Sequence, residues 1–229
     1  MPRRRTESGN ELLDLLEVLE AQHGAPPRPV PKTALDWVLW ENVAYLVSDE
    51  RRLEAYRAWK RACGLTPAGI LALTPDEMLE LSALGGMHAT QRVRKLTGIA
   101  ELVESEFGGD LGTVLGLPVS KARAALKRFP GIGAPGADKI LLFTKTAAVP
   151  ALESNGLRSL TRLGHVDEAK SYSTTYRHAV RWLADRADDD ARTLIRAFGL
   201  LRVHGQTLCK NNAPDCDACP LVDSCPSAE

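Results

Sequence analysis

Four cysteines near the end of the chain form the most specific chemical pattern in the sequence. They are spaced Cys-x6-Cys-x2-Cys-x5-Cys, so four thiols fall within seventeen residues: Cys209, Cys216, Cys219 and Cys225. Thiolates are soft, charged ligands, and at this density they repel one another unless a metal neutralises them. The spacing therefore predicts a ligand set for a metal centre.

Two metal centres and one covalent arrangement compete for these cysteines. All-cysteine zinc sites are usually built from two knuckles, each a pair of cysteines two to four residues apart. Here one Cys-x2-Cys pair is flanked by single cysteines, and one short loop around a compact object suits a [4Fe–4S] cluster, which binds four thiolates. Zinc and a pair of disulfides stay as alternatives. The fifth cysteine, Cys63, is expected to be a small buried hydrophobe.

The composition is that of a soluble globular protein, with 229 residues, 44% of them hydrophobic and 25% charged. Few aromatic residues and many Leu and Ala point to an all-helical fold. No apolar run approaches the roughly 18 residues of a membrane span. The basic start at 1–5 is not followed by the apolar core of a secretory signal. The cysteines are therefore expected to be reduced, in a cytoplasmic protein that binds no membrane.

The formal net charge is zero, with 29 basic and 29 acidic residues, which counts against a broadly basic nucleic-acid surface. Any surface for DNA must come from local segregation of charge. Lys and Arg are concentrated at 92–95 and 121–145, whereas acidic residues gather at 185–190.

A second pattern lies in the middle of the chain, where Phe-Pro-Gly-Ile-Gly at 129–133 is followed by Ala137-Asp138. A helix is expected to run into Pro130 and a second to start near Pro135. The glycines let the turn adopt positive φ, and free N–H groups of the turn and the second helix then point at a common anion. With basic side chains nearby, that anion is expected to be a DNA phosphate. Gly-x-Gly alone is equally typical of a tight turn between helices.

Helical periodicity and start signals predict the remaining elements, and no segment alternates as a strand does. A Pro-rich linker is expected at 25–31. The expected helices are 11–22, one starting near 33–34, 50–63, a short one after Thr66-Pro67, one starting at Thr74-Pro75, 89–107, 119–127, 167–185 and 189–204.

Together the two motifs resemble the endonuclease III-like helix-hairpin-helix (HhH-GPD) family of DNA glycosylases. The cysteine spacing, preceded by His204-Gly205, resembles that family's [4Fe–4S] loop, and the string at 129–138 looks like its hairpin. The motifs lie in the family's order, and the resemblance covers the chain from about Ala34 to Cys225. It implies an all-α fold with two helical lobes: a six-helix barrel that carries the hairpin, and a lobe that carries the cluster.

This resemblance implies three segments, with double-stranded DNA in the cleft between the lobes. Residues 1–32 would form a helix that packs on the cluster lobe and a Pro-rich linker. Residues 33–147 would form the barrel, with the hairpin at 121–143, and 148–229 the C-terminal helices and cluster loop. In the family, hairpin carbonyls also hold a monovalent cation, Na⁺ or K⁺. We expect a monomer, associated with the nucleoid when it is bound to DNA.

Several residues would contact DNA by this resemblance. The hairpin contacts would be Lys127, Gly131, Ile132, Gly133, Ala134, Gly136 and Lys139. Tyr45 or Leu46 stands where the family places its wedge, and Met87-His88 where a second intercalating loop belongs, because a flipped base leaves a gap to fill. Core packing is the alternative role for Tyr45.

Bifunctional members of the family have a lysine two residues after the second hairpin glycine, which forms a Schiff base with the sugar. That position is Pro135 here, so strand cleavage by this route is not expected. Lys139 and Lys145, further along the chain, are the nearby lysines that could in principle take its place.

The family's catalytic aspartate has a counterpart in the stretch 152–158. This stretch resembles the Asp-Gly-Asn-Val-x-Arg pattern of the adenine-mismatch and thymine-mismatch branches, with Asn155 and Arg158 matching. By this resemblance, Asn155 and Arg158 are expected to contact DNA. Glu153 stands where aspartate is expected, one methylene longer, and a displacement near 1 Å can cost on the order of 100-fold in rate. Either the pocket is adapted to glutamate, or catalysis has been lost.

A second carboxylate completes the candidate site. The string at 37–41 resembles the adenine-mismatch branch at the helix whose glutamate protonates the base, which makes Glu41 a candidate acid beside Glu153. Its alternative is an ordinary solvated helix residue.

Two functions follow from these patterns. The first is a monofunctional DNA glycosylase of base excision repair, which hydrolyses the N-glycosidic bond of a damaged or mismatched base without lysine-based lyase activity. The second is a catalytically inactive endonuclease III-like protein that binds DNA or lesions. An iron–sulfur electron carrier would leave the hairpin unexplained.

Overall fold

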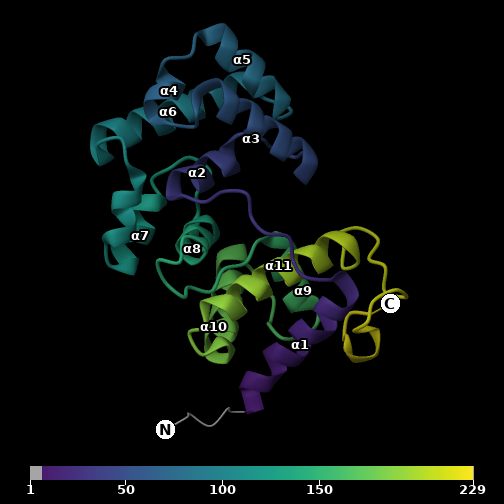
Figure 1. The fold of residues 1–229 in the computed structure, drawn as a ribbon. Helices are drawn as coiled ribbons and strands as arrows, with labels where there is room; N and C mark the ends of the chain where they lie inside the picture. The colour runs from purple at the N-terminus through teal and green to yellow at the C-terminus, as the bar shows by residue number, and fades with distance from the viewer. Residues whose placement is uncertain (1–6, 229) are drawn as a thin grey trace. The chain divides into compact units, whose positions relative to one another are not determined.

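The computed structural model describes residues 7–228, and over this range the chain consists of helices, turns and loops without a strand. The predicted all-α class is confirmed (Figure 1). The elements are α1 Glu7–His23, α2 Ala34–Asn42, α3 Asp49–Cys63, α4 Pro67–Leu71, α5 Pro75–Leu84, α6 Ala89–Phe107, η1 Leu111–Gly116, α7 Val119–Leu126, α8 Ala134–Phe143, α9 Ser154–Arg162, α10 Tyr172–Ala187, α11 Ala191–Thr207 and η2 Val222–Ser224.

The chain divides into two compact units. The central unit, Pro29–Thr144, contains α2 to α8. The terminal unit combines Met1–Arg28 with Lys145–Glu229, so that α1 packs against α10 and α11, and α9 packs against α11. Each unit buries its own apolar side chains, such as Trp59 and Ile99 in the central unit and Leu16 and Leu201 in the terminal unit.

Local capping explains where several helices begin. Thr33 accepts a hydrogen bond from the Asp36 N–H, and the Asp36 side chain accepts one from the Thr33 N–H, which forms a capping box before α2. Thr74 and Glu77 form the same box before α5, with Pro75 at the first helical position. These signals are readable in the sequence, and the helices start where they predict.

Three local expectations were wrong. The helix expected from 167 begins only at Tyr172, because Ser171 caps it by accepting the Thr174 N–H. Helix α9, Ser154–Arg162, was missed: it is short and has a glycine in its first turn, which weakens the helical signal. Cys63 is half-buried, and its thiol donates a hydrogen bond to the Trp59 carbonyl.

None of the helices within residues 7–228 combines the length and the apolar character needed to cross a bilayer.

Candidate DNA-binding and base-excision site

The turn between α7 and α8 is anchored by apolar burial. Phe129 and Ile132 are only 2% and 4% exposed, and the Phe129 ring packs 5.9 Å from that of Phe107. Gly131 has a φ of +73°, and a Cβ there would lie 3.2 Å from Asn42 Oδ1. A side chain at this position would therefore meet both backbone strain and crowding.

Asn42 connects the end of α2 to this turn. Its Nδ2 donates to the Val38 carbonyl at 2.9 Å and to the Pro130 carbonyl at 2.8 Å, and the side chain is buried. Sequence reasoning missed Asn42, because nothing in the local pattern around it indicates a partner 88 residues away.

The backbone at the start of α8 is open to a ligand. Gly133 is the N-cap residue and supplies no side-chain hydrogen bond to the first turn. Unpaired N–H groups at a helix N-terminus, together with the helix dipole, favour an anion. Lys127 lies exposed in the same turn, whereas the guanidinium of Arg128 is paired with Glu106.

Glu41 is neither solvated nor free. Its Oε1 lies 2.5 Å from Lys139 Nζ, and the two side chains are 26% and 12% exposed. The ammonium also lies 5.2 Å from the centroid of the Trp37 ring. The alternative of a solvated Glu41 is therefore wrong. Lys139, predicted as a DNA contact, is engaged in an ion pair instead of being an isolated surface cation.

The candidate intercalating residues are presented on the surface of the central unit. Tyr45, Leu46 and Met87 are 58%, 74% and 61% exposed, so core packing of Tyr45 is excluded. His88, the N-cap of α6, is also exposed, with a φ of +66°.

Arg92 fixes the loop before α6. The side chain is 4% exposed, and its guanidinium donates to backbone carbonyls of the loop, including those of Gly85 and Met87 at 2.9 Å. The backbone N–H of Tyr45, in the loop between α2 and α3, donates to the Gly85 carbonyl at 3.1 Å and so joins the two loops. A polar pocket of about 700 Å³, counting the part open to solvent, lies there, lined by Asn42, Tyr45, His88, Gln91, Arg92 and Lys95.

In the terminal unit, Glu153 is the N-cap of α9. Its Oε1 accepts the Gly156 N–H at 2.8 Å, and its Oε2 accepts the Asn155 side-chain N–H at 2.7 Å. Each oxygen keeps a further acceptor site. The glutamate side chain therefore folds back onto its own helix, where one hydrogen bond holds each carboxylate oxygen.

A chain of hydrogen bonds leads from this carboxylate to the cysteine loop. Arg158 Nη2 donates to Asn155 Oδ1 at 2.8 Å and to the Gly205 carbonyl at 2.6 Å, and Nε donates to the Cys209 carbonyl at 3.0 Å. A Cβ at Gly205 would lie 2.4 Å from the Asn155 carbonyl oxygen, so only glycine allows this approach of α9 and α11.

Tyr172 is a residue near Glu153 that sequence reasoning missed. The residue is 51% exposed, and its ring stacks on that of Tyr176 with centroids 6.3 Å apart. Burial of part of the side chain and the negative charge of Glu153 raise the pKa of the phenol. Its position at the start of a helix gave no signal in the sequence.

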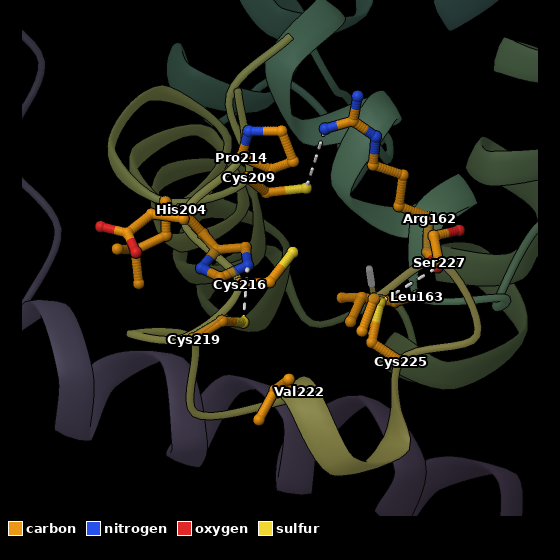
Figure 2. Close-up of a pocket in the computed structure, with 13 residues that line it drawn as sticks. Arg162, Leu163, His204, Cys209, Pro214, Cys216, Cys219, Val222, Cys225 and Ser227 are labelled. Atoms are coloured by element: carbon orange, nitrogen blue, oxygen red, sulfur yellow. Dashed lines mark hydrogen bonds between the residues drawn. The ribbon is translucent and has the colours of Figure 1, made fainter. Parts of the chain in front are cut away.

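The four loop cysteines line one pocket of the terminal unit, with a volume of about 380 Å³ that includes space open to solvent. Figure 2 shows the four side chains around this space, with Arg162 and His204 beside them. All five cysteines of the chain are free thiols, so the disulfide alternative is not supported.

Two side chains approach the sulfurs directly. Arg162 Nη1 lies 3.7 Å from Cys209 Sγ, and His204 Nε2 lies 3.9 Å from Cys219 Sγ. Burial raises the pKa of the Cys219 thiol, and the negative charges of the other three loop cysteines raise it further. Four simultaneous thiolates here therefore require a positive centre among them.

Within residues 7–228 no group of three or more His, Cys, Asp or Glu side chains is arranged to hold a metal ion. By their chemistry, the four thiols match the four thiolates that bind a [4Fe–4S] cluster, and also the all-cysteine ligand set of zinc.

Burial, together with the neighbouring His23, lowers the pKa of His204 to about 4. Burial also lowers the pKa of His23. Both imidazoles are therefore neutral near pH 7.

Comparison with known proteins places this fold and these motifs in context. No family model matches the sequence. A thymine-DNA glycosylase of Aeropyrum pernix is 30% identical over 163 residues, which are 69% of this chain and 67% of that protein. An endonuclease III of Sulfolobus acidocaldarius is 24% identical over 214 residues, 93% of this chain and 89% of that protein.

A solved structure of a non-covalent endonuclease III–DNA complex superimposes with a TM-score of 0.76 at 15% identity, covering 96% of both chains. The helical fold with its glycine turn between α7 and α8 defines the class as a helix-hairpin-helix protein. Within this class, the chain belongs to the endonuclease III-like family of DNA glycosylases.

Proposed function

We propose that this protein is a monofunctional DNA glycosylase of base excision repair, which hydrolyses the N-glycosidic bond of a damaged or mismatched base. One observation carries the proposal. Glu153, which by the sequence resemblance stands where the family has its catalytic aspartate, is held at the N-terminus of α9 by the Gly156 and Asn155 N–H groups. A carboxylate fixed in this way is prearranged to act on charge that develops in a transition state.

The chemistry assigned to Glu153 follows from the bond that breaks. Loss of the base leaves positive charge on the sugar, as in the oxocarbenium-like transition states of glycoside hydrolysis. The Glu153 carboxylate stabilises that charge and accepts the proton of the attacking water through its remaining acceptor sites. Asn155 and Arg158 are assigned as positioning residues, because the Asn155 side-chain N–H binds Glu153 Oε2 and Arg158 in turn donates to Asn155 Oδ1.

Pro135 has no amine, so hydrolysis by water is the expected chemistry, without a Schiff base. Lys139 lies four residues further along α8, on the same face, but its Nζ is paired with Glu41. An ammonium held in an ion pair is not a nucleophile. Lyase activity from Lys139 is therefore not expected. Glu41 is assigned to hold Lys139. This ion pair competes with the role of Glu41 as the acid that protonates the base.

The DNA contacts are assigned to the central unit. The open N-terminus of α8 and the exposed Lys127 fit a phosphate, while the exposed Tyr45 and Met87 fit the gap that a flipped base leaves. Arg92 supports the loop that carries Met87 by donating hydrogen bonds to the Gly85 and Met87 carbonyls.

Cys209, Cys216, Cys219 and Cys225 are assigned to hold a [4Fe–4S] cluster. A bound cluster would supply four metal–thiolate bonds that cross-link the loop. The Cys209 carbonyl of this loop accepts a hydrogen bond from Arg158, at the end of the hydrogen-bond chain that leads to Glu153.

The test is single-turnover incubation of the purified chain with duplexes that carry a panel of lesions and mismatches, each analysed with and without alkali. Strand breaks only after alkali treatment, lost in E153Q and kept in the matched surface variant E168Q, would support a monofunctional glycosylase. Breaks without alkali would refute the argument from Pro135.

The second function is a catalytically inactive DNA-binding protein. The exchange of aspartate for glutamate at position 153 favours it. Salt-sensitive DNA binding without product from any duplex would establish it.

A further inference from the structure

A pair of histidines links the cysteine loop to the end of α1. His204 lies in the last turn of α11, is 1% exposed, and points its Nε2 at Cys219 Sγ at 3.9 Å (Figure 2). Its other ring nitrogen, Nδ1, lies 3.1 Å from Nε2 of His23, the last residue of α1. The two rings meet edge to face, with centroids 5.4 Å apart.

Hydrogen-bond accounting fixes the tautomers of both rings. A neutral imidazole has one N–H donor and one acceptor nitrogen. A thiolate sulfur bound to a metal can only accept, so the His204 proton must sit on Nε2. The Nδ1 of His204 is then an acceptor, and the His23 Nε2 must donate to it. With a metal-bound Cys219, this arrangement satisfies both ring nitrogens of His204, the Cys219 sulfur and Nε2 of His23.

We propose that His204 donates a hydrogen bond to the Cys219 sulfur, with its tautomer fixed by His23, and that this bond sets the reduction potential and the retention of the bound cluster. The inference rests on the [4Fe–4S] assignment made above. Nothing in it involves the excision chemistry of Glu153.

The direction of the effect follows from charge. A donor withdraws electron density from the ligand sulfur, which favours the more electron-rich oxidation state, so hydrogen bonds to the sulfurs tune cluster potentials. Removing the His204 donor should lower the midpoint potential and make the cluster easier to oxidise and lose. Because His204 is buried, water cannot take the place of the missing donor.

Arg162 offers an internal comparison on a second ligand. Its Nη1 lies 3.7 Å from Cys209 Sγ, but the same guanidinium also donates to the Lys210 and Asn211 carbonyls on the protein surface. The Arg162 guanidinium is therefore shared between the Cys209 sulfur and two backbone carbonyls. Loss of the Arg162 donor should shift the potential less than loss of the His204 donor.

The experiment uses the full chain with its cluster. Iron and sulfide content, the midpoint potential by voltammetry and the rate of cluster loss to a chelator are measured for wild type, H204L, H204Q and H23L. H178L is the matched control, since His178 is an exposed histidine of α10. Helix content by circular dichroism confirms that each variant is folded.

H204L should have a lower midpoint potential and lose its cluster on the order of 10- to 100-fold faster than wild type, the range for loss of an outer-shell partner. H204Q should recover part of both changes, since its amide N–H can donate to sulfur. H23L should shift in the same direction by less, and H178L should match wild type.

The proposal would be overturned if folded H204L had the midpoint potential and the rate of cluster loss of the wild type. Zinc in place of iron, or no metal, in the wild-type chain would overturn it as well. Excision that depends on Glu153 is measured separately on the same wild-type preparation, so failure of this inference is distinct from failure of the glycosylase assignment.

Discussion

Neither the hairpin turn nor the cysteine loop contains an α-helix, but different forces hold them. The turn buries Phe129 and Ile132 and is tied to α2 by Asn42. In the loop, no residue from 206 to 228 is buried. Its order comes from side chains that reach out of α9 and α11, chiefly Arg158, Arg162 and His204. The turn should therefore be stable by its own packing, whereas the loop needs a cross-link.

This difference separates the two tasks of the protein. The turn belongs to the central unit and has the features of a phosphate site. The loop belongs to the terminal unit, where it supports the residues behind Glu153. Substitutions should consequently affect binding and chemistry independently.

Cys219→Ala should have the largest effect, and only on the terminal unit. Loss of a cluster ligand costs more than loss of an outer-shell partner, which already costs about 10- to 100-fold in metal affinity. Most of the iron should be absent from the purified variant, as measured by metal analysis. C63A, which changes the cysteine outside the loop, should keep its iron. Full iron content in C219A would contradict the ligand assignment.

Glu153→Gln should lower the single-turnover excision rate by at least about 100-fold, because the charge that stabilises the transition state is removed. DNA binding, measured by fluorescence anisotropy on the same duplex, should change little. A parallel loss of binding would show that Glu153 has a structural role that extends beyond its own unit.

Gly131→Ala should destabilise the turn by about 1–2 kcal/mol, the cost of a side chain in the left-handed region. The free energy of unfolding in urea and the affinity for DNA should both fall, while iron content stays at the wild-type level. G116A is the matched control, since a Cβ at Gly116 meets open space. If G131A and G116A had the same free energy of unfolding, the positive φ of Gly131 would not contribute to the stability of the turn.

Lys127→Ala should have the smallest effect. An exposed lysine at a phosphate contributes one counterion, so the slope of log affinity against log salt should fall by about 1. The excision rate at saturating protein should stay unchanged. K60A, which removes an exposed lysine from α3, should leave the slope as it is.

Much of the fold could be predicted from the sequence because its signals are local. The capping boxes at Thr33 and Thr74, the glycines of the turn and the spacing of the four cysteines all act within a few residues. Helix α9 could not be predicted, because its nine residues are stabilised mainly by packing on α11 and by the Glu153 cap.

The sequence by itself determined the helical class, the glycine turn and the candidate ligands and carboxylates, since each depends on residue type and short spacing. Only the tertiary structure decided which side chains are partners. Glu41 meets Lys139 across 98 residues, and His23 meets His204 across 181. No local pattern encodes such pairs, because they exist only after the helices have packed and burial has brought distant polar groups together.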